Sequence, residues 1–268
     1  FRRLFLCALL VGLCAGLVTS VAQRWLTVPL IAAAEVYESA LVPEPEVPAA
    51  HEHAAGMAAH SHEHEHDATA WEPEGDLERG VWTLVANVLG ATGFALLLVP
   101  MLAWWDRQRG GASASLKTGV LWGVAGWLSL FVWPALGLHP ELPGEVAAGL
   151  YARQAWWLLA VGSAAGGLAL LALATGKLRW LGVPLLVLPF VVGAPLPEGS
   201  AFANFSADAA VKMQALQSQF LIATAVTSAL QWLVIGAVSA WAVARWLRPL
   251  LAEPSDGGLP RGLVRHGV

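Results

Sequence analysis

Six stretches of the sequence are apolar over about the length that a helix needs to cross a membrane. They cover, with approximate ends, residues 4–30, 81–104, 119–138, 154–174, 178–194 and 220–244. The hydrocarbon core of a bilayer is about 30 Å thick, so a transmembrane helix needs about 20 apolar residues. Within that core the chain must bond its own backbone amides, as a helix does. The sequence therefore predicts an all-α integral membrane protein with about six transmembrane helices.

The composition agrees with a chain surrounded by lipid. Hydrophobic residues make up 57% of the sequence and charged residues only 13%, whereas soluble domains carry about 25% charged residues. The formal net charge is −4, and nucleic-acid binding would require a basic surface. The bilayer is thus the first predicted partner, and nucleic acid is not one.

The fifth apolar segment is the least regular. It is short, and Pro184 and Pro189 interrupt it. Proline removes a backbone donor and kinks or breaks a helix. Five full spans plus one irregular segment is therefore the alternative to six spans.

Basic residues are distributed unevenly between the connections. With six spans, eleven of the 15 lysines and arginines fall on one side, namely Arg2, Arg3, Arg107, Arg109, Lys117, Lys177, Arg179, Arg245, Arg248, Arg261 and Arg265. Cytoplasmic connections carry the excess of Lys and Arg in membrane proteins. We therefore predict a multi-pass protein of the bacterial inner membrane, with both termini cytoplasmic and the connection after the first span in the periplasm.

That first connection is rich in histidine and glutamate. It contains six of the eight histidines, which are His51, His53, His60, His62, His64 and His66. Imidazole is a good ligand for borderline divalent metals such as cobalt, nickel and zinc, and carboxylates add oxygen ligands. Residues 43–73 are predicted to form a flexible external loop that captures such a metal. A solvated loop that binds no metal is the alternative.

A fixed metal site is predicted at the outer helix ends. Glu35 and Glu38 are three residues apart and share one helix face. His139, followed by Glu141 and Glu145, lies at the outer end of the third segment. Glu35, Glu38 and His139 are the candidate ligands, and the alternative is that they are solvated interfacial groups.

Four further residues are candidates for the lining of a transport path. Asn87 and Gln231 lie near the middle of the second and sixth segments, while Pro184 and Pro189 break the fifth. Polar groups and broken helices often line ion pathways in membrane proteins. Hydrogen bonding between helices and simple kinking are the alternatives.

Residues 1–250 are predicted to form a single helical membrane domain. Residues 206–219 are predicted to extend the last helix outward, and residues 251–268 to form a disordered cytoplasmic tail. Glycine pairs such as Gly12 and Gly16, Gly119 and Gly123, and Gly162 and Gly166 are predicted to pack helices, with a surface for oligomer formation as the alternative. The sequence contains no phosphate-binding loop and no hydrolase or c-type haem signature, so we predict no enzyme activity and no organic cofactor.

Several motifs together resemble the CbtA family of predicted cobalt transporter subunits. They are Phe-Arg-Arg-Leu-Phe-Leu at residues 1–6, Ala-Glu-Val-Tyr-Glu at 34–38, Trp-Glu-Pro at 71–73 after the histidine-rich loop, Leu-His-Pro-Glu-Leu-Pro-Gly at 138–144 and Arg-Gln-Ala-Trp-Trp at 153–157. The resemblance covers about the first two thirds of the chain. It implies a cobalt substrate, a vitamin B12 context and a small single-span partner like CbtB.

The combined interpretation is a membrane subunit for uptake of a divalent transition metal, cobalt in the first place, with nickel or zinc as alternatives. The loop would capture the metal and pass it to the helix ends. One alternative is a non-transporting metal sensor or accessory subunit of a larger complex. The other is an electron-transfer subunit that holds haem or a metal centre.

Overall fold

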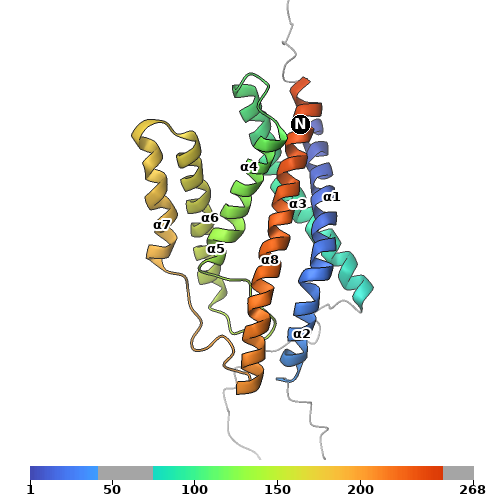
Figure 1. Ribbon diagram of the computed structural model, residues 1–268, viewed down its shortest axis with the longest axis vertical. Coiled ribbons are helices and arrows are strands. Elements are labelled where there is room, and N and C mark those ends of the chain that lie inside the picture. Colours follow the sequence, from blue (N-terminus) through green and yellow to red (C-terminus); the bar gives the residue numbers. More distant parts are fainter. Residues whose placement is uncertain (42–74, 250–268) are drawn as a thin grey trace, which may run out of the picture.

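The computed structural model describes residues 1–41 and 75–249, and all regular elements in these two ranges are helices (Figure 1). The α-helices are α1 (Arg2–Leu26), α2 (Val28–Ser39), α3 (Asp76–Gln108), α4 (Leu116–Trp127), α5 (Trp133–Ala135), α6 (Leu150–Leu173), α7 (Gly182–Val192) and α8 (Ala207–Ala242). Three short helices of other types join them, which are η1 (Leu128–Val132), η2 (Gly176–Leu181) and η3 (Val243–Leu247). The prediction of an all-helical chain is confirmed for this part of the sequence.

Five helical segments of the described chain are long and apolar enough to cross a membrane. They are Arg2–Leu26, Asp76–Gln108, Leu116–Ala135, Leu150–Leu173 and Ala207–Leu247. The fifth predicted span instead consists of η2 and α7, and α7 has only 11 residues, about half of what a span needs. The number that meets the length criterion is therefore five, which matches the alternative of five full spans plus one irregular segment. The chain still reverses direction there, because α7 runs back along α6 and residues 193–206 continue to the start of α8 (Figure 1).

Glycines allow the main helices to pack closely. A Cβ atom at Gly12 of α1 would overlap Thr92 of α3, and one at Gly119 of α4 would overlap the backbone of α8 at Gly236. Such contacts bring helix backbones together and gain packing energy. At Gly162 of α6, by contrast, no atom lies within 4 Å of the position of a Cβ. The glycines of α1 and α4 thus pack helices of the same chain, while Gly162 faces open space.

The two ends of the helix bundle differ in charge. The start of α1, the α3–α4 connection, the α6–α7 turn and the end of α8 lie at one end (Figure 1). We call it the basic end, because it carries Arg2, Arg3, Arg107, Arg109, Lys117, Lys177, Arg179, Arg245 and Arg248. The opposite end is formed by α2, residues 136–149, residues 193–206 and the start of α8. We call it the acidic end, since it carries Glu35, Glu38, Glu141, Glu145 and Asp208.

The last helix extends well beyond a single membrane crossing. Ala207–Leu247 is continuous over 41 residues, about 60 Å at 1.5 Å per residue and twice the thickness of the hydrocarbon core. The prediction that residues 206–219 extend this helix is confirmed, and its first residues pack at the acidic end. There Met213 and Phe220 of α8 join Ala34, Leu142 and Phe202 in a small core, which is separate from the main core of α1, α3 and α8. This small core is the platform on which the polar groups of the acidic end are built.

Candidate functional site

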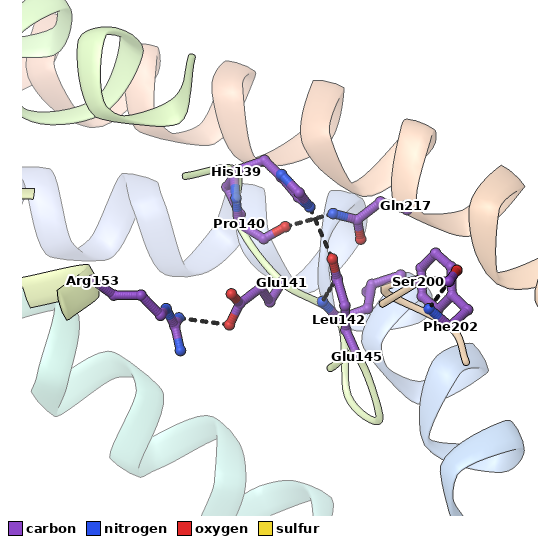
Figure 2. A network of polar contacts seen from close by, with 9 residues as sticks. All are labelled: His139, Pro140, Glu141, Leu142, Glu145, Arg153, Ser200, Phe202 and Gln217. Atoms are coloured by element: carbon purple, nitrogen blue, oxygen red, sulfur yellow. Dashed lines mark hydrogen bonds and ion pairs between the residues drawn. The ribbon is translucent and has the colours of Figure 1, made fainter. Parts of the chain in front are cut away.

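A polar turn follows α5 at the acidic end of the bundle. Pro140 and Pro143 prevent a continued helix, and Gly144 has φ +77°, a left-handed conformation that glycine adopts without steric cost. The amide of Glu145 donates to the carbonyl of Leu142 at 3.2 Å. The chain thereby folds back, so that the side chain of Glu145 returns toward the start of the turn (Figure 2).

His139 and Glu145 form the centre of this turn. Nε2 of His139 lies 2.8 Å from Oε1 of Glu145, and the amide of Leu142 donates to Oε2 at 3.1 Å. The Glu145 side chain is only 3% exposed, whereas that of His139 is 48% exposed. A buried carboxylate is costly unless it is paired, so Glu145 holds the imidazole in place while the ring itself stays accessible from outside.

Neighbouring groups fix the turn against two helices. Arg153 of α6 donates to Oε2 of Glu141 at 2.6 Å, and Nε2 of Gln217 of α8 donates to the carbonyl of Pro140 at 2.7 Å (Figure 2). The Oε1 atom of Gln217 is buried and has no partner among the described residues. The turn is therefore held by α6 on one side and by α8 on the other.

The small core also packs against this turn. Leu142 is 3% exposed within that core, and the amide of Val146 donates to the carbonyl of Ala201 at 2.8 Å. A Cβ atom at Gly144 would lie 3.4 Å from Cβ of Glu38, so the turn packs directly against α2. The end of α2 and the histidine of the turn are thus part of one packed unit.

Glu35 and Glu38 do not join His139 in a common cluster. Glu35 of α2 pairs with Arg79 of α3, with Nη1 at 2.9 and 3.1 Å from its two carboxylate oxygens. Glu38 has no ion pair within residues 1–41 and 75–249, and these ranges contain no group of three or more His, Cys, Asp or Glu side chains suited to a metal ion. Among the predicted ligands in the described chain, His139 alone has a carboxylate, that of Glu145, in direct contact.

The polar residues predicted along the spans have different surroundings. Asn87 of α3 donates from Nδ2 to Oγ of Ser20 at 2.9 Å and to Oε1 of Gln23 at 2.7 Å, both on α1. Gln231 is half-buried on α8 and makes no side-chain hydrogen bond with another described residue. Asn87 therefore joins two helices, as one of the two sequence interpretations expected, and Gln231 stays a candidate for the lining of a path.

The proline-containing helix α7 receives hydrogen bonds from two tryptophans. Trp133 donates its indole N–H to the carbonyl of Leu186 at 2.9 Å, and Trp156 donates to that of Pro189 at 3.0 Å. Pro184 lies in the first turn of α7 and Pro189 in its interior. Two α7 carbonyls that could have faced an ion are thus bonded to indole groups from α5 and α6.

The six histidines of the first connection, His51, His53, His60, His62, His64 and His66, lie outside the described residues, as does the predicted tail at 251–268. The residues on either side of the connection are described. Glu35, near its beginning, and Arg79, just after its end, form the ion pair given above. The helices that precede and follow the connection, α2 and α3, are thus linked by an ion pair.

The sequence interpretation missed the partners of its own candidates. Arg79, Arg153 and Gln217 were not proposed as site residues, and Glu145 was named only as a neighbour of His139. The sequence did single out Arg79 and Arg153, because they are two of the four basic residues that do not lie on the predicted cytoplasmic side. A cation in an acidic surrounding is expected to pair with a carboxylate, although the sequence does not tell which one.

A buried ion pair closes the opposite, basic end. Asp106 of α3 is 2% exposed and binds Arg248 at 2.9 and 3.0 Å. Its Oδ1 atom also accepts from the amide of Ala114 at 2.6 Å, and Arg248 donates to the carbonyl of Ala114 at 3.0 Å. The end of α3, the α3–α4 connection and the residue that follows η3 are thereby joined at one point.

The described residues contain five apolar helices of spanning length and polar clusters at both bundle ends, which is the pattern of a multi-pass helical membrane protein. A family model described as "Probable cobalt transporter subunit (CbtA)" matches residues 1–244, and the chain therefore belongs to the CbtA family. No curated protein and no solved structure matches it. The family description is that of a transport subunit, a class that is generally not enzymatic.

Proposed function

We propose that this chain takes up a divalent transition metal across the inner membrane, cobalt in the first place, and that the His139–Glu145 pair is the first fixed binding point on its way. The family membership supports cobalt as the substrate. The contact of 2.8 Å between an exposed imidazole and a buried carboxylate is the observation that carries the site. Nitrogen and oxygen ligands of this kind suit cobalt, nickel and zinc.

The position of the pair supports a transfer from the histidine-rich segment. The ion pair between Glu35 and Arg79 links α2 and α3, the helices that precede and follow residues 42–74, and α2 packs against Gly144 of the turn. In this proposal the six histidines raise the local metal concentration on the periplasmic side. His139 then accepts the ion, and water fills the positions that protein ligands do not occupy.

A site with two protein ligands suits transport. Conduction requires binding that is favourable enough to attract an ion and weak enough to release it. Glu35 is neutralised by Arg79 and Glu141 by Arg153, so neither competes strongly for the cation. His139 and Glu145 are thus the groups in this network that can exchange a hydrogen bond for a metal ion.

The test is uptake of radioactive cobalt by proteoliposomes, with nickel and zinc as competitors. We compare the unmodified chain with His139→Ala, and Glu145→Gln with the control Glu141→Gln, which changes the carboxylate of the same turn that binds Arg153. Loss of one of two ligands should raise the cobalt concentration for half-maximal uptake at least about tenfold, as loss of even an outer-shell partner does. Uptake that is equal in His139→Ala and in the unmodified chain would refute the site.

The same experiment tests the function itself. Liposomes are prepared with the chain alone and with a single-span partner like CbtB. Cobalt binding without flux in either preparation would favour the accessory-subunit alternative. The electron-transfer alternative has no support in the described chain, because none of its five candidate spans contains a histidine that could bind haem.

A further inference from the structure

A pocket with three arginines opens at the basic end of the bundle, far from the candidate metal site. It has a volume of about 500 Å³ and lies between the start of α1, the end of α3 and η3. Its basic wall is formed by Arg2, Arg3 and Arg107, and its apolar wall includes Leu4, Trp104 and Leu247. No carboxylate from residues 1–41 or 75–249 lines it.

The three arginines are not neutralised within the described chain. None of them forms an ion pair or a side-chain hydrogen bond with another residue in the ranges 1–41 and 75–249. The nearest carboxylate in sequence, Asp106, is buried and turned toward Arg248. Three guanidinium groups around one cavity repel each other, and a bound anion would relieve this repulsion.

The apolar wall of the pocket continues along the outer surface of α3. Trp104 is 58% exposed, and Met101 and Leu97, three and seven residues earlier, are 49% and 66% exposed. Residues at this spacing lie on one helix face. A ligand with a phosphate head and a hydrocarbon chain would therefore find cationic groups in the pocket and an apolar surface directly beside it.

We propose that this pocket binds the phosphate headgroup of an anionic phospholipid, with an acyl chain along the Leu97, Met101 and Trp104 face of α3. Guanidinium groups match phosphate oxygens in geometry and charge, and basic pockets between helices at a membrane surface bind such headgroups. The apolar face distinguishes a lipid from free phosphate, which would gain nothing from it.

Native mass spectrometry of the full chain in detergent tests this proposal. Phosphatidylglycerol is titrated against phosphatidylcholine with the same acyl chains, and inorganic phosphate serves as a competitor. The pocket variant replaces Arg2, Arg3 and Arg107 by glutamine. The matched control replaces Lys117, Lys177 and Arg245 by glutamine, which removes the same charge from the same end without changing the pocket.

The pocket variant should bind phosphatidylglycerol on the order of 100-fold more weakly, since each basic residue at a membrane surface contributes about fivefold, or ~1 kcal/mol. The control variant should lose much less, and phosphatidylcholine should bind weakly to all three proteins. If the triple change prevents folding, Arg107→Gln alone should lose about fivefold, with Arg245→Gln as its control.

Three outcomes would overturn the proposal. Equal losses in the pocket and control variants would mean that the charge of the whole basic end attracts the lipid. Equal binding of the two lipids would remove the role of the phosphate charge. Displacement of the lipid by millimolar inorganic phosphate would make the pocket a site for a free anion.

Discussion

Replacement of Gly144 by alanine should weaken the turn that holds the candidate metal site. Gly144 has φ +77°, and an added Cβ would lie 2.8 Å from Cζ of Phe205 and 3.4 Å from Cβ of Glu38. The first distance is shorter than a normal carbon–carbon contact. Alanine therefore meets both an unfavourable backbone conformation and a steric overlap.

The expected cost follows from these two effects. A non-glycine residue in the left-handed conformation costs about 1–2 kcal/mol, and overpacking typically costs about 1–3 kcal/mol. Because the ring of Phe205 can move in part, we expect a total loss of about 3 kcal/mol in the free energy of unfolding. In a chain of this size, that corresponds to a decrease in Tm on the order of 10 °C.

Gly149 provides a matched control in the same connection. It has φ −53°, and no atom lies within 4 Å of its Cβ position. Gly149→Ala should change the free energy of unfolding by less than about 1 kcal/mol, since a weaker helix cap and a less flexible unfolded chain offset each other. Thermal unfolding of both variants in detergent, followed by circular dichroism, measures the difference.

A double variant separates the two contributions. In a Phe205→Ala background the steric overlap is removed, so Gly144→Ala should then cost only about 1–2 kcal/mol from the backbone. Cobalt binding by Gly144→Ala should also weaken, because the displaced turn separates His139 from Glu145. A Tm for Gly144→Ala within about 2 °C of that of Gly149→Ala would refute the reasoning.

Two other contacts make further stability predictions. Asp106→Ala should lower the free energy of unfolding by about 3 kcal/mol, the low end for breaking a buried ion pair, because Arg248 is partly exposed; an unchanged Tm would contradict a joining role for this pair. Trp156→Phe should cost about 1 kcal/mol through the lost hydrogen bond to the Pro189 carbonyl. Trp157→Phe, at a partly exposed ring without such a bond, should be closer to neutral in the same thermal assay.

The helices could be predicted from the sequence because their main determinant is local. Apolar length identifies a span without any knowledge of its neighbours, and all five long helices lie within or around predicted segments. The short helix α7 was predicted as irregular for an equally local reason, the presence of Pro184 and Pro189. Its indole partners, Trp133 and Trp156, come from other helices, and for that reason they could not be assigned.

The candidate site was predictable only in part, because its chemistry depends on which groups meet. The i, i+3 spacing correctly put Glu35 and Glu38 on one helix, but it could not show that Arg79 neutralises Glu35. The proline and glycine residues after His139 indicated a turn. The return of Glu145 to the imidazole depends on the left-handed Gly144 and on packing against α2 and α8, which lie far away in the sequence.

Three charged residues lie at the end of the bundle where the opposite charge prevails, and their pairing explains why His139 is the candidate metal ligand. Arg79 and Arg153 at the acidic end each bind a carboxylate, and Asp106 at the basic end binds an arginine. Each of these carboxylates is neutralised by its arginine, so it competes only weakly for a metal ion. The buried carboxylate of Glu145 is paired instead with His139, and an imidazole nitrogen is a common metal ligand. In the proposed function an incoming cation would replace the hydrogen bond between His139 and Glu145, so the carboxylate would stay paired, and binding and release would not expose an uncompensated buried charge.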